Sequence, residues 1–519
     1  MRRRDISKLL LASASASGVS ALAQRAEAQT CAAPCYAQTA AEVAASVTPT
    51  NYSFPPGDVR RYGADPTGVA SSVTAIQACA KCSGSIFFGG PNATYKIDSV
   101  VNFFGNGYQL YGLGRDVTAL FLTSTGAIVF GDQSKSSHSH SYELKDLTIN
   151  GNVRAQGTTA VQCYLADWTH IENVLFFNIN GSAIYAERCF DCRITRCHFQ
   201  TCGGSNAGVV ELNYVGTEEN NHWSISDNQF ESSYWNDILL VGASDEADHF
   251  INRNKFGVPS YVVQSAADMQ QYHIYGDNLI GTSIVDNWFF NGGIAVMVNC
   301  VSYKVQDNHA RNLSQGVWDS GGGGGVFQIS GNQIQGNNSV NSTTGSLAVN
   351  HWGIRVDGEN GYAGPGNDVI KFGINYQVWA GATNNYVIFP ESGGQTGSVN
   401  DGGTGTRVVQ LDVKAQPLTL LNGWATAGFA TPSYTRLGNN VLLKGMIYGG
   451  SIAAGTVIAT LPAGYFPGQG IQFFVNYTDN GAAFSPGSLQ LDISGNVMIG
   501  SVSAGTVHIS LDGMSFSLI

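Results

Sequence analysis

One short phrase recurs through residues 144–334, and it constrains the fold more than any other feature of the chain. Each copy has an aliphatic residue, two variable residues, a ladder residue, one variable residue and usually a large apolar residue. The ladder positions lie 27, 23, 31, 26, 33, 21 and 24 residues apart. A period of about 20–50 residues marks a solenoid or a propeller. Strand-like phrases without helical spacing predict that each copy is one coil of a parallel β-helix. The eight copies are Leu144/Leu147/Ile149, Ile171/Val174/Phe176, Ile194/Cys197/Phe199, Ile225/Asn228/Phe230, Ile251/Asn254/Phe256, Ile284/Asn287/Phe289, Val305/Asn308/Ala310 and Ile329/Asn332/Ile334.

The ladder residue is asparagine in the last five copies and Leu147, Val174 or Cys197 in the first three. An amide carries both donors and acceptors, so inward-facing asparagines on successive coils can satisfy one another. The sequence therefore predicts a structural amide ladder that starts near the fourth coil.

Composition supports an all-β chain with many turns: 43% of residues are hydrophobic, 12% are charged, and 64 of the 519 are glycine. The formal net charge is −11, and no basic run occurs beyond the N-terminus. We therefore expect no nucleic acid partner, and a polyanionic substrate is disfavoured.

The first residues predict export. Arginines at positions 2–4 precede Ile6 and Lys8, a mild apolar stretch follows over 9–22, and Ala26-Glu27-Ala28 suits cleavage. This pattern resembles a twin-arginine signal over residues 1–28, with an ordinary signal peptide as the alternative, and predicts a periplasmic or secreted protein. Residues 29–57 read as a linker, and no later segment is apolar for 18 residues, so no membrane insertion is expected.

Ten cysteines lie between positions 31 and 300. In an exported chain they indicate structural disulfides or buried thiols. The clusters Cys79/Cys82 and 189/192/197/202 leave zinc as an alternative, but only His198 accompanies them at close spacing. We expect no metal site and no cofactor.

A strand and a turn over 58–68 precede a predicted helix around Ala75-Ile76-Gln77-Ala78. Further strands follow at 85–88, 95–97 and 108–114. This succession resembles the opening of the pectate-lyase-like right-handed parallel β-helix superfamily, whose relatives include rhamnogalacturonases, epimerase-like proteins and phage tailspikes. The resemblance implies a β-helix over 58–390 with an N-terminal capping helix, and a polysaccharide as the partner.

Residues 391–407 are rich in Gly, Ser and Thr and read as a second linker. Short alternating strands then predict a C-terminal β-sandwich-like domain over 408–519. Its segment 455–467 resembles the C-terminal domains of phage tail fibres and tailspikes. That resemblance implies carbohydrate binding or trimerisation, and a homotrimer is expected.

No compact catalytic motif is present, so chemistry is sought on the outer face of a sheet. If Ile184, Val210 and Ile238 face inward, strand alternation turns their odd-numbered neighbours outward. Offset by two positions on adjacent coils, two carboxylates have backbones about 8 Å apart, which suits an inverting glycosidase. We predict Glu211 and Asp237 as acid and base, Glu187 in reserve, and Tyr185 as a substrate-binding residue; the alternative is that these acids are solvated surface.

Long segments between the phrases are expected to overhang this face as loops, and Trp235 and Glu231 on them are predicted to bind substrate. Hydrolysis is the first hypothesis because acids dominate the predicted outer face. A polysaccharide lyase, which would draw its base from scattered residues such as His273, is the second. A non-catalytic carbohydrate-binding adhesin is the third.

Overall fold

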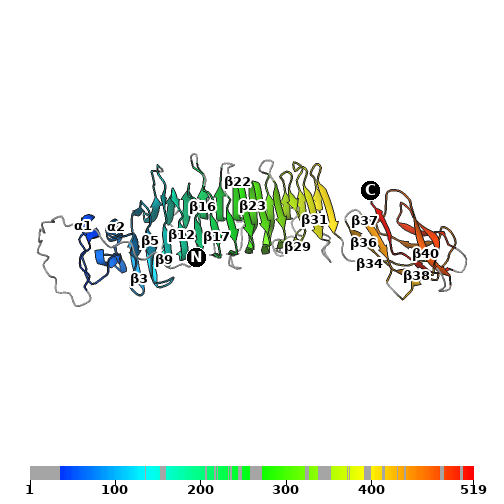
Figure 1. Ribbon diagram of the computed structural model, residues 1–519, viewed down its shortest axis with the longest axis horizontal. Coiled ribbons are helices and arrows are strands. Elements are labelled where there is room, and N and C mark those ends of the chain that lie inside the picture. Colours follow the sequence, from blue (N-terminus) through cyan, green and yellow to red (C-terminus); the bar gives the residue numbers. More distant parts are fainter. Residues whose placement is uncertain are drawn as a thin grey trace, which may run out of the picture.

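The chain winds into a long stack of parallel coils, with short helices at one end and a separate β domain at the other (Figure 1). This computed structural model describes residues 35–518 except 135, 152–158, 205–206, 216–217, 219, 232, 234–235, 243–247, 258–271, 322–325, 337–351, 371, 373, 391–398, 412–414, 429–430, 438–439, 480–483 and 503–505. The predicted signal, residues 1–28, lies outside the described residues. No described helix is long and apolar enough to span a membrane.

Each coil contributes strands to three faces, and each strand pairs in parallel with the equivalent strand of the next coil. Four long strands turn a corner and serve two faces: β9 (Glu143–Asn150), β12 (His170–Phe177), β22 (Tyr272–Val285) and β24 (His309–Asp319). The longest strand, β23 (Trp288–Gln306), turns two corners and serves all three faces. Face A also contains β2 (Ser85–Phe87), β5 (Gln109–Tyr111), β14 (Arg193–Thr195), β17 (Ser224–Ser226), β20 (Phe250–Asn252), β25 (Phe327–Ser330), β28 (Tyr362–Ala363), β31 (Tyr386–Pro390) and β33 (Arg407–Leu411). Face B contains β1 (Thr67–Ser71), β3 (Ala93–Ile97), β6 (Thr118–Leu122), β15 (His198–Gln200), β18 (Gln229–Glu231), β21 (Lys255–Gly257), β26 (Gln333–Gly336) and β29 (Asp368–Ile370). Face C contains β4 (Val100–Phe103), β7 (Ala127–Gly131), β10 (Val161–Tyr164), β13 (Ile184–Glu187), β16 (Gly208–Asn213), β19 (Asn236–Val241), β27 (Trp352–Val356), β30 (Ile374–Val378) and β32 (Val399–Asp401). Two further strands of two residues each, β8 (Ser139–His140) and β11 (Ala166–Asp167), pair with each other in parallel in a small sheet of their own.

The predicted right-handed parallel β-helix is confirmed, and the recurring phrase is the corner between faces A and B. The residue just before the ladder position has a positive φ in seven successive coils: Asp146, Asn173, Arg196, Asp227, Arg253, Asp286 and Asp307. Asp and Asn tolerate this left-handed conformation better than other non-glycine residues, and they fill five of the seven places. One such residue turns the chain sharply, so the next side chain points inward.

The amide ladder forms where the asparagines begin. The Nδ2 of Asn228 donates to Oδ1 of Asn254 at 3.0 Å, and each following rung repeats this bond. Each Oδ1 also accepts the backbone N–H of the preceding rung, beginning with Cys197 at 2.9 Å. The ladder extends through Asn332 to Asn367, one rung beyond the prediction. These buried amides therefore hold the coil register and do no chemistry.

Apolar stacks fill the rest of the interior. Five phenylalanines stack with ring centroids 4.7–5.0 Å apart, which is the spacing of paired strands: Phe176, Phe199, Phe230, Phe256 and Phe289. Seven of the described cysteines are buried free thiols: Cys79, Cys163, Cys189, Cys192, Cys197, Cys202 and Cys300. Burial raises the pKa of the Cys163, Cys197 and Cys202 thiols to about 12. Of the two structural roles expected for cysteine, these seven residues adopt the buried thiol.

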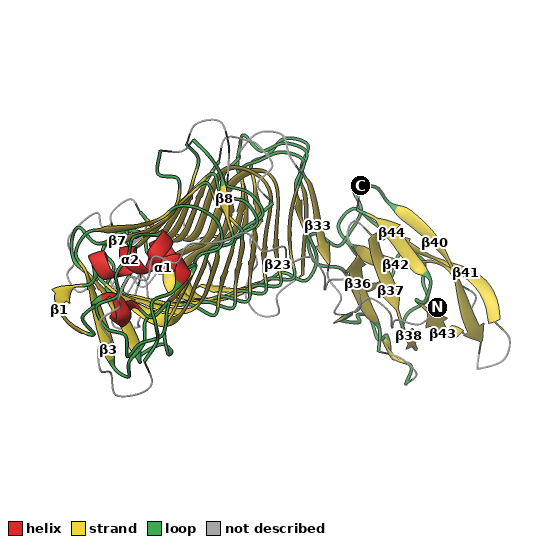
Figure 2. Ribbon diagram, turned by 60° about the vertical axis from the view of Figure 1, so that its left-hand side comes forward, coloured by secondary structure: helices red, strands yellow, loops and turns green. Residues whose placement is uncertain are grey.

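The N-terminal end of the stack is covered by α1 (Ala40–Ala44), the 3-10 helix η1 (Val59–Tyr62) and α2 (Val73–Cys82) (Figure 2). The prediction of a capping helix is confirmed in α2, which buries Ile76 and Cys79. The prediction of a linker over 29–57 is wrong for its described part. Glu42 is 1% exposed and binds the buried Arg61 guanidinium at 2.6 and 2.9 Å, so residues 35–57 pack as part of the cap.

The coils continue beyond residue 390, so the predicted linker over 391–407 is also corrected where the structure describes it. β32 pairs in parallel with β30, and β33 with β31. The predicted sandwich follows, with one sheet of β34 (Gln416–Pro417), β36 (Ser433–Leu437), β37 (Asn440–Lys444) and β44 (Met514–Ser517). The facing sheet holds β35 (Ala425–Thr426), β38 (Met446–Tyr448), β39 (Val457–Thr460), β40 (Ile471–Asp479), β41 (Phe484–Leu491), β42 (Asn496–Ser501) and β43 (Thr506–Ser510). A separate apolar core that includes Val441, Leu443, Leu489 and Ile509 lies in this domain.

Candidate functional site

Two of the predicted carboxylates lie together on face C, where Glu211 is half-buried and Glu187 is only 4% exposed. Glu211 on β16 is the direct cross-strand neighbour of Tyr185 on β13, and Glu187 is the neighbour of Asn213. Glu211 and Glu187 are therefore offset by two residues on adjacent coils, as predicted. Their inward neighbours Ile184 and Val210 are fully buried in the core. The coil register therefore places these two acids next to each other.

Hydrogen bonds connect the two acids to polar neighbours. Tyr185 Oη donates to Glu187 Oε1 at 2.5 Å, and Asn213 Nδ2 donates to Tyr185 Oη at 3.4 Å. Ser182 Oγ donates to Glu211 Oε2 at 2.7 Å. The cluster orients its two carboxyl groups through different donors, so their chemical environments differ.

Electrostatics also distinguish the two acids. Burial raises the pKa of Glu211, and the nearby charge of Glu187 adds to this, while the Ser182 hydroxyl and the Gly208 backbone N–H oppose it. Burial, followed by the hydrogen bond to Glu187, raises the pKa of Tyr185, so this phenol keeps its proton and acts as a donor. A carboxyl group of raised pKa beside a second carboxyl group is an arrangement that suits general acid–base catalysis.

Asp237 does not face outward, and that prediction is wrong. Asp237 is 3% exposed, and its carboxyl group lies 2.5 Å from His273 Nδ1. The centroid of the His273 ring lies 5.8 and 5.7 Å from those of the core rings of Phe256 and Phe289. The equivalent residue of the preceding coil, Val209, is also buried beside its buried neighbour Val210. The corner before each face C strand therefore turns two consecutive side chains inward, and strand alternation starts one residue later than expected.

We expect Asp237→Ala to destabilise the fold by about 3 kcal/mol, because it leaves the buried His273 without its partner. The folded variant should keep its catalytic rate, since the pair lies on the inner side of the sheet. Urea unfolding, together with the specific activity of the folded fraction, checks both points. A folded Asp237→Ala variant without activity would show that Asp237 takes part in catalysis.

The two other predicted binding residues are not brought to this cluster. Glu231 was expected on a loop, but it ends β18 on face B, where its carboxylate lies 2.9 Å from His198 Nε2. Trp235 lies outside the described residues. Glu231 therefore belongs to a different surface of the solenoid from Glu211.

Sequence reasoning missed four polar residues beside the carboxylates. Ser182 and Asn213 donate to the cluster, and Gln162 and Tyr164 on β10 are the cross-strand neighbours of Tyr185 and Glu187. Aligning Val161–Tyr164 with Ile184–Glu187 would have found the last two. Ser182 precedes its strand, so no alternation pattern points to it.

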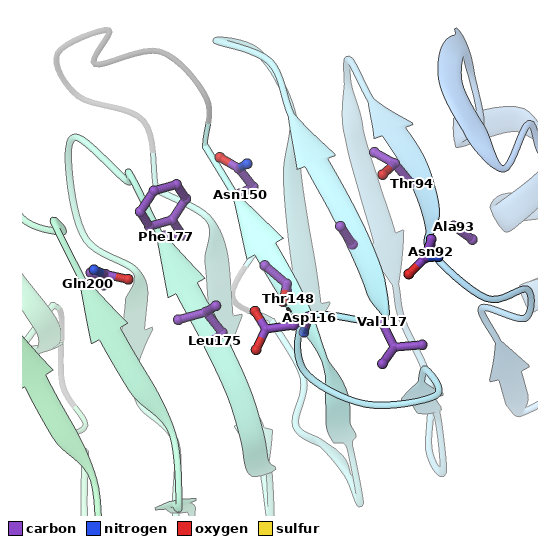
Figure 3. A pocket seen from close by; sticks show the side chains of 11 residues that line it. Asn92, Ala93, Thr94, Asp116, Val117, Thr148, Asn150, Leu175, Phe177 and Gln200 are labelled. Carbon is purple, nitrogen blue, oxygen red and sulfur yellow. Dashed lines mark hydrogen bonds between the residues drawn. The ribbon is translucent and has the colours of Figure 1, made fainter.

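A concave surface lies on face B near the N-terminal end, with a volume of about 400 Å³. Leu175, Thr148 and Asp116 point toward one another there, with Phe177 and Asn150 nearby (Figure 3). The Asp116 backbone N–H donates to Thr148 Oγ1 at 3.1 Å. Asp116 is the only carboxylate among its lining residues, so this groove suits binding better than acid–base catalysis.

No protein-family model matches the sequence, and no curated protein matches it. Solved structures do match, and they include phage tailspikes, surface adhesins and enzymes that act on carbohydrates. The architecture is that of the parallel β-helix proteins.

Three of these structures illustrate the extent of the similarity. DFA-IIIase from Arthrobacter chlorophenolicus is 14% identical over 66% of this chain and 96% of its own, with a TM-score of 0.47. An Acinetobacter phage tailspike is 10% identical over 86% of this chain and 82% of its own, with a TM-score of 0.39. The receptor binding protein of Listeria phage PSA is 24% identical over 20% of this chain and 65% of its own, with a TM-score of 0.18. At these sequence identities and TM-scores the matches say nothing about the reaction.

Proposed function

We propose that this protein hydrolyses glycosidic bonds of a polysaccharide, with Glu211 as general acid and Glu187 as general base. The observation that carries the proposal is the pairing of two carboxyl groups. Glu211 has a raised pKa, and Glu187 lies on the adjacent coil, offset by two residues along the strand. Glu187 replaces Asp237 in this assignment because Asp237 faces the core.

The offset of one coil and two residues separates the two backbones by about 8 Å. The two carboxyl groups of an inverting enzyme lie roughly 6.5–9.5 Å apart, which leaves room for a water molecule, and this backbone offset is compatible with such a spacing. Glu211 gives its proton to the glycosidic oxygen as the bond to the anomeric carbon breaks. Glu187 takes a proton from water while the water oxygen bonds to that carbon from the opposite side.

Tyr185 favours hydrolysis over elimination. A lyase needs a base that removes a proton from the sugar ring, and a phenol serves only when it is ionised. The pKa of Tyr185 is raised, and its hydroxyl group donates to Glu187. Tyr185 thus positions the base.

The groove on face B favours a second candidate function, which is carbohydrate binding without cleavage. Its lining combines the apolar Leu175 and Phe177 with the amides Asn150 and Gln200. Apolar surfaces together with a few fixed polar groups are typical of small-ligand sites.

Export to the periplasm or beyond remains a prediction. Assembly into a homotrimer is also a prediction, and light scattering checks it.

The test of the reaction is incubation with neutral glucans, mannans and fructans and with polyuronates. New reducing ends without ultraviolet absorbance of an unsaturated sugar are the expected result, with inverted anomeric configuration of the first product by NMR. Reducing ends together with that absorbance would indicate elimination. Retained binding without either signal would favour the adhesin hypothesis.

We expect Ser182→Ala to move the alkaline limb of kcat/KM to higher pH. The Ser182 hydroxyl stabilises ionised Glu211, so its loss raises the pKa of Glu211 further. Because the acid works only when protonated, activity then persists to higher pH. A pH–rate profile measures the limb, and Ser224→Ala on face A is the matched control. An unchanged or lowered limb would show that Glu211 is not the acid.

A further inference from the structure

Glu211 begins a continuous row of outward side chains that runs along face C toward the C-terminal end. Successive cross-strand neighbours in this row are Glu211, Leu239, Tyr275, Met297, Trp318 and Arg355. Five coil steps separate its ends, which corresponds to about 24 Å along the axis. The row therefore extends far beyond the reach of a single sugar at Glu211.

The far end of the row is a fixed aromatic platform. The Arg355 guanidinium lies 4.3 Å from the ring centroid of Trp379 and 4.6 Å from that of Trp318. Asp357 binds this guanidinium through two bonds of 2.8 and 2.6 Å and also accepts Trp318 Nε1–H at 3.0 Å. Trp379 is nevertheless 50% exposed. Asp357 balances the charge of Arg355, and the exposed part of Trp379 is the aromatic surface that remains open to a ligand.

Polar side chains flank the row on the same strands. Asp277 and Asn299 are cross-strand neighbours, and Asn299 Nδ2 donates to Asp277 Oδ1 at 2.7 Å. Amides and carboxylates suit the hydroxyl groups of a sugar, whereas carboxylates repel a polyuronate. This flank distinguishes the row from a surface built to pack against a second copy, because interface cores are depleted of charged residues.

We propose that this row is an extended binding track for an uncharged polysaccharide that lies along the solenoid axis, from the Glu211–Glu187 pair to Trp379. The proposal deepens the proposed function by assigning its substrate class and a distal subsite. Trp379, held in place by Arg355 and Trp318, binds a sugar ring through its exposed apolar face, and the flanking polar side chains bind the hydroxyl groups. Long chains therefore bind better than fragments that span only the carboxylate pair.

The test compares Trp379→Ala with wild type on a cleaved neutral polysaccharide and on its short oligosaccharides. We expect kcat/KM for the polymer to fall about 10-fold while the value for the shortest cleaved fragment changes less than about 2-fold. Trp288→Ala on face B, where Trp288 is 41% exposed, is the matched control and should change neither value. Polyuronates should neither be cleaved nor compete.

Three outcomes overturn the track. The first is an unchanged rate on the polymer, and the second is an equal loss on polymer and fragment. The third is a change in oligomeric state by light scattering, which would make the row an interface between copies. If wild type cleaves nothing, the proposed function fails, and the polymer affinity of Trp379→Ala still tests the track: weaker binding than wild type supports it, and equal binding overturns it.

Discussion

Glu211→Gln lowers kcat on a polysaccharide about 1,000-fold, if Glu211 supplies the proton to the leaving oxygen. Glutamine keeps the shape of the side chain and can still accept the Ser182 hydroxyl, but it has no proton of suitable acidity. The loss should appear in kcat and in kcat/KM together, because the missing proton transfer occurs only in the transition state. Initial rates of reducing-end release measure it.

The leaving group makes this experiment more specific. An aryl glycoside with an acidic phenol leaves without protonation, so Glu211→Gln should cleave it with a much smaller loss. Glu187→Gln should be inactive on both substrates, because activation of water is needed whichever group leaves. Glu143→Gln on face A, where Glu143 is bonded to Lys145, is the matched control and should keep full activity. Full activity in Glu211→Gln would remove the acid from the mechanism.

Asn287→Ala reduces the free energy of unfolding by about 4 kcal/mol. The Asn287 side chain accepts the backbone N–H and the Nδ2–H of Asn254 at 3.0 Å and donates to the Ile251 carbonyl and to Asn308 Oδ1. Alanine removes all four bonds and leaves the buried backbone N–H of Asn254 and one of its Nδ2 protons without an acceptor, and each orphaned group costs about 1–3 kcal/mol. Some of that cost is recovered if water enters the cavity.

Urea unfolding and amide hydrogen exchange check this expectation. Exchange should rise most at the coils next to Asn287, because a solenoid coil contacts mainly its neighbours. Asn102→Ala is the control, since Asn102 is exposed on β4, and it should change stability by less than about 0.5 kcal/mol. A ladder variant as stable as this control would show that the amides do not hold the register.

The recurring phrase and its asparagines were sufficient to predict the coils and the ladder, because both repeat at a fixed place in each coil. They also predicted that Glu211 lies two positions from Glu187 and Asp237 on the adjacent coils. They did not predict the inward turn of Asp237. Alternation assumes a straight strand. The strand that contains Ile238 begins at a corner, where Asp237 and Ile238 both face the core.

Local composition led to two wrong linker predictions, one at each end of the β-helix. Residues 35–57 look like a linker because they are rich in small and polar residues, yet Glu42 is held by Arg61, 19 positions later in the chain. A buried ion pair of this kind leaves no local pattern in the sequence. The parallel strands β32 and β33 were likewise hidden in a segment rich in glycine.

The sequence by itself determined the period, the interior and the coil register, because these depend on which residue types recur at which spacing. Only the tertiary structure decided how deeply each acid is buried and which groups it contacts. Exposure depends on the direction of each corner, and the pKa of Glu211 depends on burial and on Ser182, Gly208 and Glu187, residues that its own periodic pattern does not specify. The repeat therefore determines where side chains stand along the axis, and the corners determine whether they can act on a substrate.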